Sequence, residues 1–437
     1  MKRESGIKRI VSIVLLLAMC AFLFVVGRKS ADVNIKIADE ETENLTSEEL
    51  TSDIQPHEPA APEYVHPEDG YYCLLEDGVN FALRGQVGGT CWLYSAVCAM
   101  VTAYQVKNGS PIDQFDAHAL VWDVFDEDEN GGVEGAGEES GGVSFFVINE
   151  LSQGFGDGYV LDGAIEALNW SIEEYKEGIQ KYGALYIGIP DTRKSVIKIT
   201  DGYTCLNWPD PGEDDYDHSI AVIGWDDHFP KEYFADEATR DGAWITYNSN
   251  RAGIYYYVSY DTPFDQLNDP PHFMSVSDEY AKVLTHDSGK WTENVAGEGK
   301  ITTANVFKES GTLTAVGTYI TEDDSDLTIQ IMTPDLKEVL YSEEVHADYA
   351  GYSVFKLDTP LEVEEYAISV TYPDGAPVEG ESGDYGWMCI RTFSNEGESF
   401  ILQDGDWLDL SLESTWDKIG FVTNNACIRA LYGIIER

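Results

Sequence analysis

The segment Arg84-Gly-Gln-Val-Gly-Gly-Thr-Cys-Trp-Leu-Tyr-Ser-Ala-Val-Cys98 decides how this chain is interpreted. A glycine-rich turn ends at Thr90, and the apolar residues that follow recur at helical spacing as far as Val106. The pattern therefore places Cys91 in the first turn of a helix. The partial positive charge at a helix N-terminus favours thiolate over thiol, and the thiolate is the nucleophilic form of cysteine.

Two later segments contain the partners that a cysteine nucleophile needs. His218 opens an apolar run that ends in Gly-Trp225, and Asn248 follows the apolar run that begins at Gly242. Both patterns predict buried strands. An imidazole within hydrogen-bond reach can hold the thiol proton, and an asparagine can fix the tautomer and orientation of the ring.

These three segments together resemble the cysteine, histidine and asparagine motifs of papain-like cysteine peptidases, over roughly residues 71–265. The resemblance implies an α+β fold with two lobes, one helical and one resembling a β-barrel. It also implies that Cys91 attacks a peptide carbonyl and forms an acyl-enzyme, with His218 as acid and base and Asn248 as its orienting partner. Gln86 and the backbone N–H of Cys91 would stabilise the oxyanion.

Candidate substrate-binding residues follow from the same resemblance. Gly141 and Gly142 correspond to a glycine pair whose backbone binds an extended peptide, and Trp92 directly follows the nucleophile. Glycine allows such a peptide to approach the chain closely. The alternative is that the two glycines belong to an ordinary loop.

The chain departs from the family pattern in two places. Gln86 lies five positions before Cys91, where the family usually has six. The family usually continues Asn-Ser with Trp-Gly, whereas this chain reads Asn248-Ser249-Asn250-Arg251. The missing tryptophan normally shields the histidine–asparagine hydrogen bond from water, and Tyr255 or Tyr256 is the candidate replacement.

The C-terminal third consists of short alternating runs separated by turn residues, which is typical of an antiparallel β-sandwich. Residues 298–437 resemble the lectin-like domain that follows papain-like domains in some bacterial surface proteins. A glycan is therefore a candidate ligand of this domain. Trp387, Trp407 and Trp416 could stack on sugars or could pack within the sandwich.

The N-terminal segment predicts export. Basic residues precede an uncharged apolar run from Ile10 to Gly27, so residues 1–29 are interpreted as a signal anchor in preference to a cleaved signal peptide. Residues 30–66 are acidic and rich in proline and predict a disordered spacer. The peptidase domain is expected over 67–275, and a connector over 276–297.

Composition restricts the partners of this chain. Its 437 residues include 79 acidic and 27 basic side chains, a formal net charge of −52. Such a charge excludes nucleic acid as a main partner and disfavours docking on anionic lipid. The acidic stretch Asp126–Val133 resembles half of an EF-hand loop, but the twelfth position is Gly137 instead of a glutamate, so a solvated loop is expected. No metal or other cofactor is expected.

Cysteine usage favours thiols over disulfides. Six cysteines lie beyond Cys20, sparsely spaced along a chain long enough to fold without cross-links. The sequence therefore predicts buried apolar thiols at every one of these positions except Cys91, although the even number also permits disulfides.

The sequence as a whole predicts an extracellular cysteine-type endopeptidase, either tethered to the cell surface by the N-terminal segment or secreted. Its substrate would be a protein or peptide. Two alternatives remain open: a papain-like adhesin that has lost activity and binds a glycan or protein, and an amidase or transpeptidase acting on cell-wall peptides.

Overall fold

A computed structural model describes the chain over residues 64–79, 85–112, 117–125, 127–128, 131–134, 141–154, 158–190, 197–200, 202–210, 218–235, 238–249, 255–266, 269–287, 291–296, 299–384 and 389–433. The predicted membrane segment, 1–29, and the predicted spacer as far as residue 63 lie outside these residues. Within the described ranges no helix is both long enough and apolar enough to cross a membrane.

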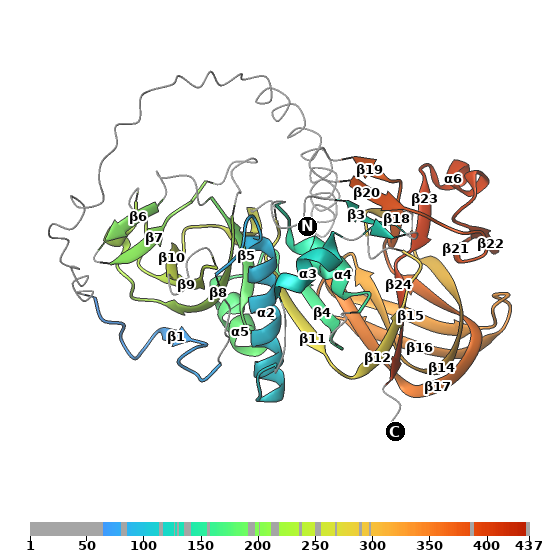
Figure 1. The fold of residues 1–437 in the computed structure, drawn as a ribbon, viewed down its shortest axis with the longest axis horizontal. Helices are drawn as coiled ribbons and strands as arrows, with labels where there is room; N and C mark the ends of the chain where they lie inside the picture. The colour runs from blue at the N-terminus through green and yellow to red at the C-terminus, as the bar shows by residue number, and fades with distance from the viewer. Residues whose placement is uncertain are drawn as a thin grey trace, which may run out of the picture.

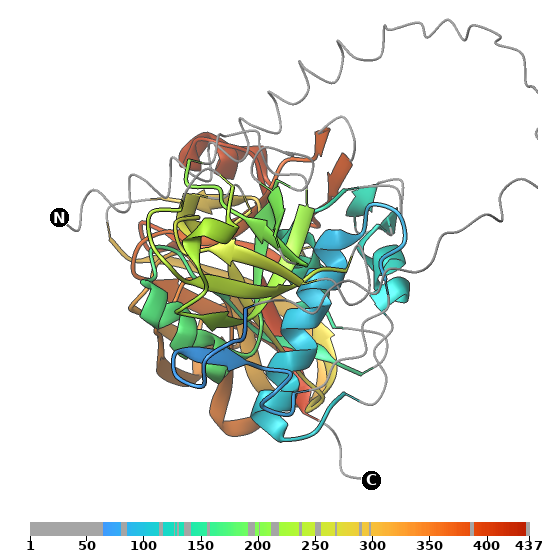
Figure 2. The same cartoon turned by 90° about the vertical axis from the view of Figure 1, so that its left-hand side faces the viewer.

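The helical lobe is built around α2 (Cys91–Asn108), as the apolar periodicity predicts. The helix ends at Gly109, whose φ of 68° is the left-handed conformation that glycine adopts most readily. Two short helices, α3 (Ala117–Val124) and α4 (Ser144–Leu151), pack against α2. In Figures 1 and 2, α2 lies against the strands of the second lobe.

The second lobe is a sheet that curves around a core of aliphatic and aromatic side chains. Its central strand β8 (His218–Asp226) pairs with β5 (Leu185–Ile189), β9 (Ala243–Tyr247) and β1 (Tyr71–Cys73). The sheet continues from β9 through β10 (Tyr255–Ser259), β7 (Tyr203–Leu206) and β6 (Ile197–Thr200). Helix α5 (Ile172–Tyr182) packs on this lobe, and two short 3-10 helices cover Lys231–Tyr233 and Phe264–Gln266.

Two residues that the sequence assigns to the spacer take part in the described fold. Tyr64 and His66, assigned to the end of the spacer, both bind the buried carboxylate of Asp226 at the end of β8. Tyr64 donates its hydroxyl over 3.0 Å, and His66 Nδ1 lies 2.6 Å from the same oxygen. Because a buried carboxylate is stable only with such partners, these residues belong to the fold of the second lobe.

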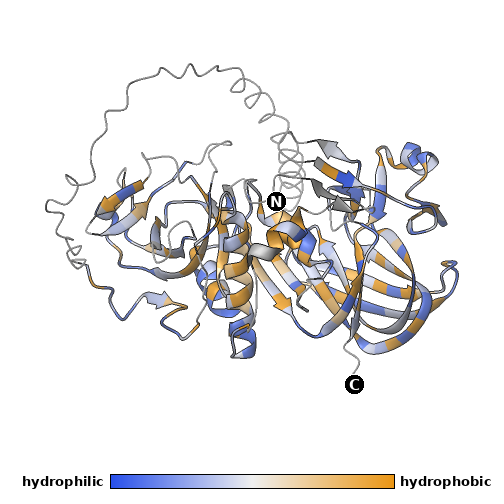
Figure 3. Cartoon of the chain, viewed as in Figure 1, coloured by the Kyte–Doolittle hydropathy of each residue, from blue (hydrophilic) through white to orange (hydrophobic). Residues whose placement is uncertain are grey.

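The C-terminal domain, predicted as a β-sandwich and called the sandwich below, is built mainly of antiparallel strands. Its long strands β14 (Ile301–Ile320) and β17 (Gly351–Tyr372) pair along most of their length. Buried and exposed residues alternate along much of β15 (Ser325–Met332), which is the pattern of a strand with one face in the core. Figure 3 shows the same alternation of hydropathy along several strands of this domain. The remaining elements are β16 (Val339–Ala347), β13 (Glu293–Val295), β18 (Ala376–Gly380), β21 (Ser399–Gln403), β22 (Asp406–Asp409), α6 (Glu413–Ile419), β23 (Thr423–Ala426) and β24 (Ile428–Gly433).

Strand pairings join the two domains into one continuous structure. β11 (His272–Ser277) pairs with β4 (Val160–Glu166), and β4 also pairs with β17 of the sandwich. β12 (Tyr280–Leu284) pairs with β24. The predicted connector, 276–297, therefore contains paired strands, and Figure 1 shows β4, β11 and β12 between the two halves of the molecule.

The acidic segment also takes part in this junction. β2 (Glu127–Asp128) and β3 (Gly131–Glu134) form a hairpin, and β3 pairs on its other side with β20 (Cys389–Thr392) of the sandwich. β19 (Gly383–Asp384) completes this small sheet. Residues 127–128 and 131–134 thus form paired strands where the sequence predicts a loop, because a strand of the second domain pairs with β3.

A buried ion pair lies at the same junction. Arg429 of β24 donates from Nη2 to Asp287 over 2.7 Å, and both side chains are completely buried. Arg429 Nε also donates to Ser152 Oγ, which follows α4, over 3.2 Å. Among the described arginines of the sandwich, Arg429 is the one that is fully buried, and it lies against the end of a helix of the N-terminal domain.

Replacing Asp287 by alanine is expected to lower the free energy of unfolding by about 3–5 kcal/mol, because Arg429 would be left charged and unpaired in the interior. Urea unfolding of the full chain measures the change. The exposed pair between Lys337 and Asp335 serves as the control, and Asp335→Ala should leave the unfolding midpoint almost unchanged. Equal midpoints for the two variants would contradict a stabilising role for the buried pair.

Candidate active site

Cys91 is the first residue of α2, and its side chain is partly accessible. The other cysteines whose side chains are described, Cys73, Cys98, Cys205 and Cys427, are buried and form no disulfide. Burial raises the pKa of the Cys205 thiol to about 12 and also raises the pKa of Cys98. Among the cysteines whose side chains are described, Cys91 is therefore the one that a reagent from solution can reach.

The loop before Cys91 is held in a tight turn. Gly88 has a φ of 59°, which a larger side chain would adopt only with strain. Thr90 donates its hydroxyl to the carbonyl of Val87 over 2.7 Å, and its own carbonyl accepts the first helical hydrogen bond from Tyr94. No acidic side chain lies in the first turn of α2, so none offsets the partial positive charge there.

His218 and Asn248 form a buried hydrogen bond. His218 Nε2 lies 2.8 Å from Asn248 Oδ1, and both side chains are buried. Because an amide oxygen only accepts, His218 Nε2–H is the donor. In the neutral ring, Nδ1 is then the basic nitrogen, which is the arrangement that a proton acceptor for a thiol requires.

The strand register produces this bond. β8 and β9 pair with Ala221 opposite Tyr247, and continuing the register by one residue places Asn248 opposite Ile220. His218 lies two residues from Ile220 and therefore on the same face of the sheet. The histidine and asparagine are thus diagonal neighbours at one end of the strand pair.

Gln86 binds the residue that follows Asn248. Its backbone N–H donates to the carbonyl of Ser249, and Ser249 Oγ donates to Gln86 Oε1, each over 2.9 Å. Gln86 Nε2 donates one hydrogen to Gly88 O over 3.0 Å, and the same nitrogen carries a second. Two backbone segments 163 residues apart are therefore joined beside the predicted nucleophile.

Ser249 was not assigned a role from the sequence, although it stands inside the asparagine motif. Its hydroxyl donates to the oxygen of the Gln86 amide, whose nitrogen faces Gly88 O because a carbonyl only accepts. The signal that could have identified Ser249 is its place directly after Asn248. The partner of its hydroxyl follows only from the three-dimensional structure.

The predicted substrate-binding residues occupy different environments. Gly141 is exposed and Gly142 is partly exposed, directly before α4. Trp92 is completely buried and packs in edge-to-face contact with Phe125 and Phe146. A side chain added at Gly142 would come within 2.4 Å of the Trp92 ring, so the indole packs directly against this glycine. In this structure Trp92 offers no surface to a substrate, which corrects its predicted role.

A buried polar cluster connects the two lobes next to these glycines. Asp269 accepts hydrogen bonds from the backbone N–H of Ser144 over 3.0 Å and from its hydroxyl over 2.6 Å. Tyr186 of β5 donates to the same carboxylate, and its hydroxyl lies 2.8 Å from Ser219 Oγ, beside His218. Ser144, Asp269, Tyr186 and Ser219 are all buried.

Sequence reasoning missed this cluster. Asp269 begins the run Asp-Pro-Pro-His272, in which an acid and a histidine enter an apolar strand. That composition was the available signal, but the partners of Asp269 lie 83 and 125 residues away along the chain.

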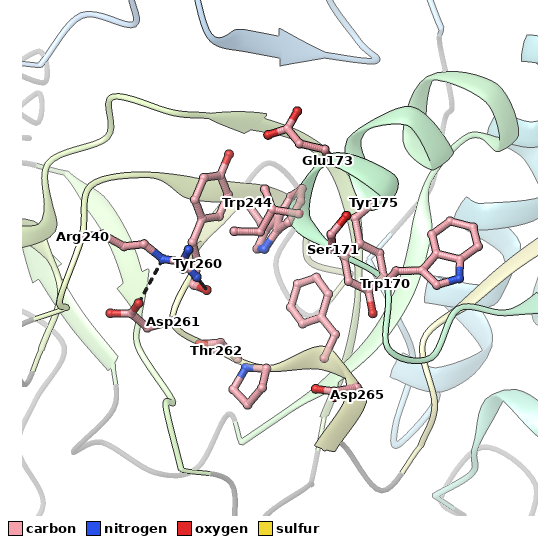
Figure 4. A pocket seen from close by; sticks show the side chains of 13 residues that line it. Trp170, Ser171, Glu173, Tyr175, Arg240, Trp244, Tyr260, Asp261, Thr262 and Asp265 are labelled. Carbon is pink, nitrogen blue, oxygen red and sulfur yellow. Dashed lines mark hydrogen bonds and ion pairs between the residues drawn. The ribbon is translucent and has the colours of Figure 1, made fainter. Parts of the chain in front are cut away.

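A cavity of about 520 Å³ lies elsewhere, between the N-terminal end of α5 and residues 260–265. Figure 4 shows aromatic side chains around it, with an ion pair between Arg240 and Asp261 at 3.1 Å. Arg240 also donates to the carbonyl of Tyr260 over 2.5 Å. The predicted site residues do not line this cavity, and its arginine and Asp261 are engaged with each other.

The described part of the chain shows no group of three or more His, Cys, Asp or Glu side chains arranged to hold a metal ion. Of the three tryptophans considered for sugar stacking, Trp387 lies outside the described residues. Trp416 donates its indole N–H to Leu410 O over 2.7 Å, and Trp407 packs beside Phe400 against a small apolar cluster. Both described tryptophans are partly buried.

The fold is that of a cysteine protease domain followed by a lectin-like domain. Residues 283–432 match the family described as Lectin like domain. No curated protein matches the chain in sequence.

Two solved structures share the arrangement of both domains. One is the Clostridial cysteine protease Cwp84 after propeptide cleavage, with a TM-score of 0.68 and 18% identity, covering 83% of this chain and 98% of that chain. The other contains the cysteine protease and lectin-like domains of Cwp84, a surface layer associated protein of Clostridium difficile, with a TM-score of 0.69 and 17% identity, covering 86% and 91%. These likenesses establish the two-domain fold.

His272 is buried, and its Nδ1 lies 3.0 Å from Ser144 Oγ of the polar cluster that connects the lobes. This histidine predicts a pH dependence of the free energy of unfolding. Burial lowers the pKa of His272 from 6.5 to about 4. Between these pH values the unfolded chain binds a proton that the folded chain does not. The contribution is therefore fully present above pH 6.5 and is lost as the pH falls toward 4, by about 3 kcal/mol.

Urea unfolding at several pH values between 7 and 4 measures this loss. His272→Gln retains an amide that can donate to Ser144 and does not titrate, so its stability should depend less on pH in this interval. A variant with the same pH dependence as the wild type would contradict the assignment to His272.

Proposed function

We propose that the chain is an exported cysteine-type endopeptidase that hydrolyses peptide bonds through an acyl-enzyme on Cys91. The observation that carries this proposal is the buried hydrogen bond between His218 Nε2 and Asn248 Oδ1. It gives the ring the tautomer that a general base requires. The contact between Gln86 and Ser249 supports the proposal, because it brings the loop of the cysteine to the same strand end.

The proposed reaction begins with transfer of the Cys91 thiol proton to His218 Nδ1. The thiolate attacks the carbonyl carbon of the substrate and forms a C–S bond, and the oxyanion receives the backbone N–H of Cys91 and the Gln86 amide. The C–N bond then breaks as His218 returns the proton to the leaving amine. Water, deprotonated by His218, attacks the thioester and releases the acid product and the thiol.

The substrate is proposed to be a protein or peptide that lies along Gly141 and Gly142. Both glycines have exposed surface, and neither has a side chain that would hold a peptide away from the backbone. Trp92 acts in this proposal as the support beneath Gly142. No cofactor takes part in the proposed chemistry.

An extracellular location belongs to the same proposal. It rests on the N-terminal apolar segment of the sequence and on the two-domain fold shared with Cwp84, which is described as a surface layer associated protein. We propose the N-terminal segment as a membrane tether or, if it is cleaved, as a secretion signal.

One observation favours the alternative of a binding protein that lacks turnover. Gln86 Nε2 already donates one hydrogen within its own loop, to Gly88 O. If that bond kept the amide from the substrate, the domain would bind peptides without hydrolysing them. An amidase or transpeptidase acting on cell-wall peptides would use the same three residues, and the choice of substrate separates it from an endopeptidase.

Cys91→Ala is expected to abolish hydrolysis of a mixed peptide library, because the other cysteines whose side chains are described are all buried. Purified cell wall is assayed in parallel, and release of peptides from it alone would favour the amidase. Product formation followed by mass spectrometry is the measurement. The matched control is Cys98→Ala on the same helix, which should retain activity and which tests for general damage to α2.

Peptide binding by the wild type without any turnover would support the adhesin. Full hydrolytic activity in the Cys91→Ala variant would rule out the proposed nucleophile.

Gln86→Ala is expected to lower kcat by about 100-fold or more with a smaller effect on KM, because an oxyanion donor acts chiefly in the transition state. Steady-state kinetics with a peptide substrate measure the split. Gln105→Ala is the matched control. Gln105 lies near the C-terminal end of α2, the helix that begins at Cys91, and donates to Gly78 O. A kcat close to that of wild type would remove Gln86 from the oxyanion site.

A further inference from the structure

Helix α4 is held at its two ends by two different parts of the molecule. It spans Ser144–Leu151 and begins two residues after Gly142. The residues at its N-terminal end contact the second lobe of the peptidase domain, and those at its C-terminal end contact the lectin-like domain. In Figure 1, α4 lies between these two parts of the structure.

Asp269 holds the N-terminal end. Its carboxylate accepts both the backbone N–H and the hydroxyl of Ser144, the first residue of the helix. The residue before it, Val143, provides no side-chain cap. A carboxylate at this position also interacts favourably with the partial positive charge of the helix N-terminus. The loop before β11 therefore performs the capping that the helix's own sequence lacks.

The lectin-like domain holds the other end. Tyr319 of β14 donates its hydroxyl to Asn149 Oδ1 over 2.5 Å, and Arg429 Nε donates to Ser152 Oγ over 3.2 Å. The Arg429 guanidinium lies over the Tyr319 ring at 4.9 Å. Asn149, Ser152, Tyr319 and Arg429 are all buried, so these bonds do not exchange readily with water.

These contacts restrict the position of Gly142. The Trp92 ring lies beneath it, too close for any side chain, and the anchored Ser144 follows two residues later. A helix of eight residues has few internal hydrogen bonds with which to hold its own position. The place of Gly142 therefore depends on what binds the two ends of α4.

We propose that the lectin-like domain is a working part of the peptidase, with Tyr319 and Asp269 as positioning residues that fix Gly141 and Gly142 for substrate through α4. The proposal rests on the proposed peptidase function. It assigns the second domain a role in substrate binding that needs no sugar.

Tyr319→Phe is the principal test, because it removes one hydroxyl and leaves the buried ring in place. We expect KM for a peptide spanning the cleft to rise by about threefold to tenfold, with kcat within about twofold of wild type. Asp269→Asn, which exchanges an acceptor for a donor facing Ser144, should raise KM further. Steady-state kinetics on the full chain give both values.

Two controls match these variants. Tyr372→Phe removes an equally buried hydroxyl of the same domain, which is bonded to Thr318 Oγ1 of β14 at 2.6 Å. Asp226→Asn changes a buried carboxylate of the second lobe that binds Tyr64 and His66. Both should leave KM near the wild-type value.

A second readout separates positioning from general damage. Iodoacetamide is small enough to alkylate Cys91 without using the glycine pair, so its rate should be unchanged in Tyr319→Phe and Asp269→Asn. Hydrogen exchange of backbone amides 141–144 should be faster in both variants than in the controls. A rise in KM with an unchanged alkylation rate and faster exchange supports the proposal.

Three results would overturn it. These are a wild-type KM in Tyr319→Phe, an equal rise in KM in Tyr372→Phe, or a fall in the alkylation rate parallel to the loss of peptide hydrolysis. Absence of peptide hydrolysis by the wild type, with Cys91 readily alkylated, would instead refute the proposed peptidase function. In that case the positioning by α4 would be tested by hydrogen exchange alone. Exchange of backbone amides 141–144 at the same rate in Tyr319→Phe as in the wild type would refute it.

Discussion

The hydrogen bond between His218 and Asn248 depends on the pairing register of β8 and β9, and the rest of the candidate site depends on that bond. A shift of one residue would move His218 to the opposite face of the sheet and would break its hydrogen bond with Asn248. The register is fixed because every residue of both strands is buried. The aliphatic and aromatic core of the second lobe therefore determines the tautomer of the candidate general base.

The other half of the site comes from a different lobe, so its geometry rests on contacts between distant segments. Gln86 and Ser249 exchange two hydrogen bonds across the lobe boundary, one from the backbone and one from a side chain. Asp269 provides a second connection, to the start of α4. The contact of Asp269 is buried, and the contact between Gln86 and Ser249 is partly buried. Both contacts therefore favour one relative placement of the two lobes. Stabilisation of a transition state requires such a pre-formed site.

The sequence predicted the features that are encoded locally. The helix that begins at Cys91, the strand that begins at His218 and the strand before Asn248 each have their own periodicity, and all three form as expected. Side-chain environments were harder to predict. Trp92 could be placed on the helix but not assigned to its buried face, because α2 is buried nearly all round its N-terminal half. The role of Asp269 depends on partners that no local pattern indicates.

The contacts at the domain boundary could not be predicted from local sequence patterns either. Composition changes near the start of the sandwich, and the two domains can be recognised separately in the sequence. The core nevertheless continues across their junction: Tyr319, Tyr352 and Cys427 of the sandwich pack in one apolar cluster with side chains of α2 and α4. Separation of the domains would expose these aromatic residues and the buried charge of Arg429 to water. The sandwich therefore forms part of the interior of the N-terminal domain and is not a separate appended module. Substitutions in its β14 and β24 strands act close to the helix that follows Gly142.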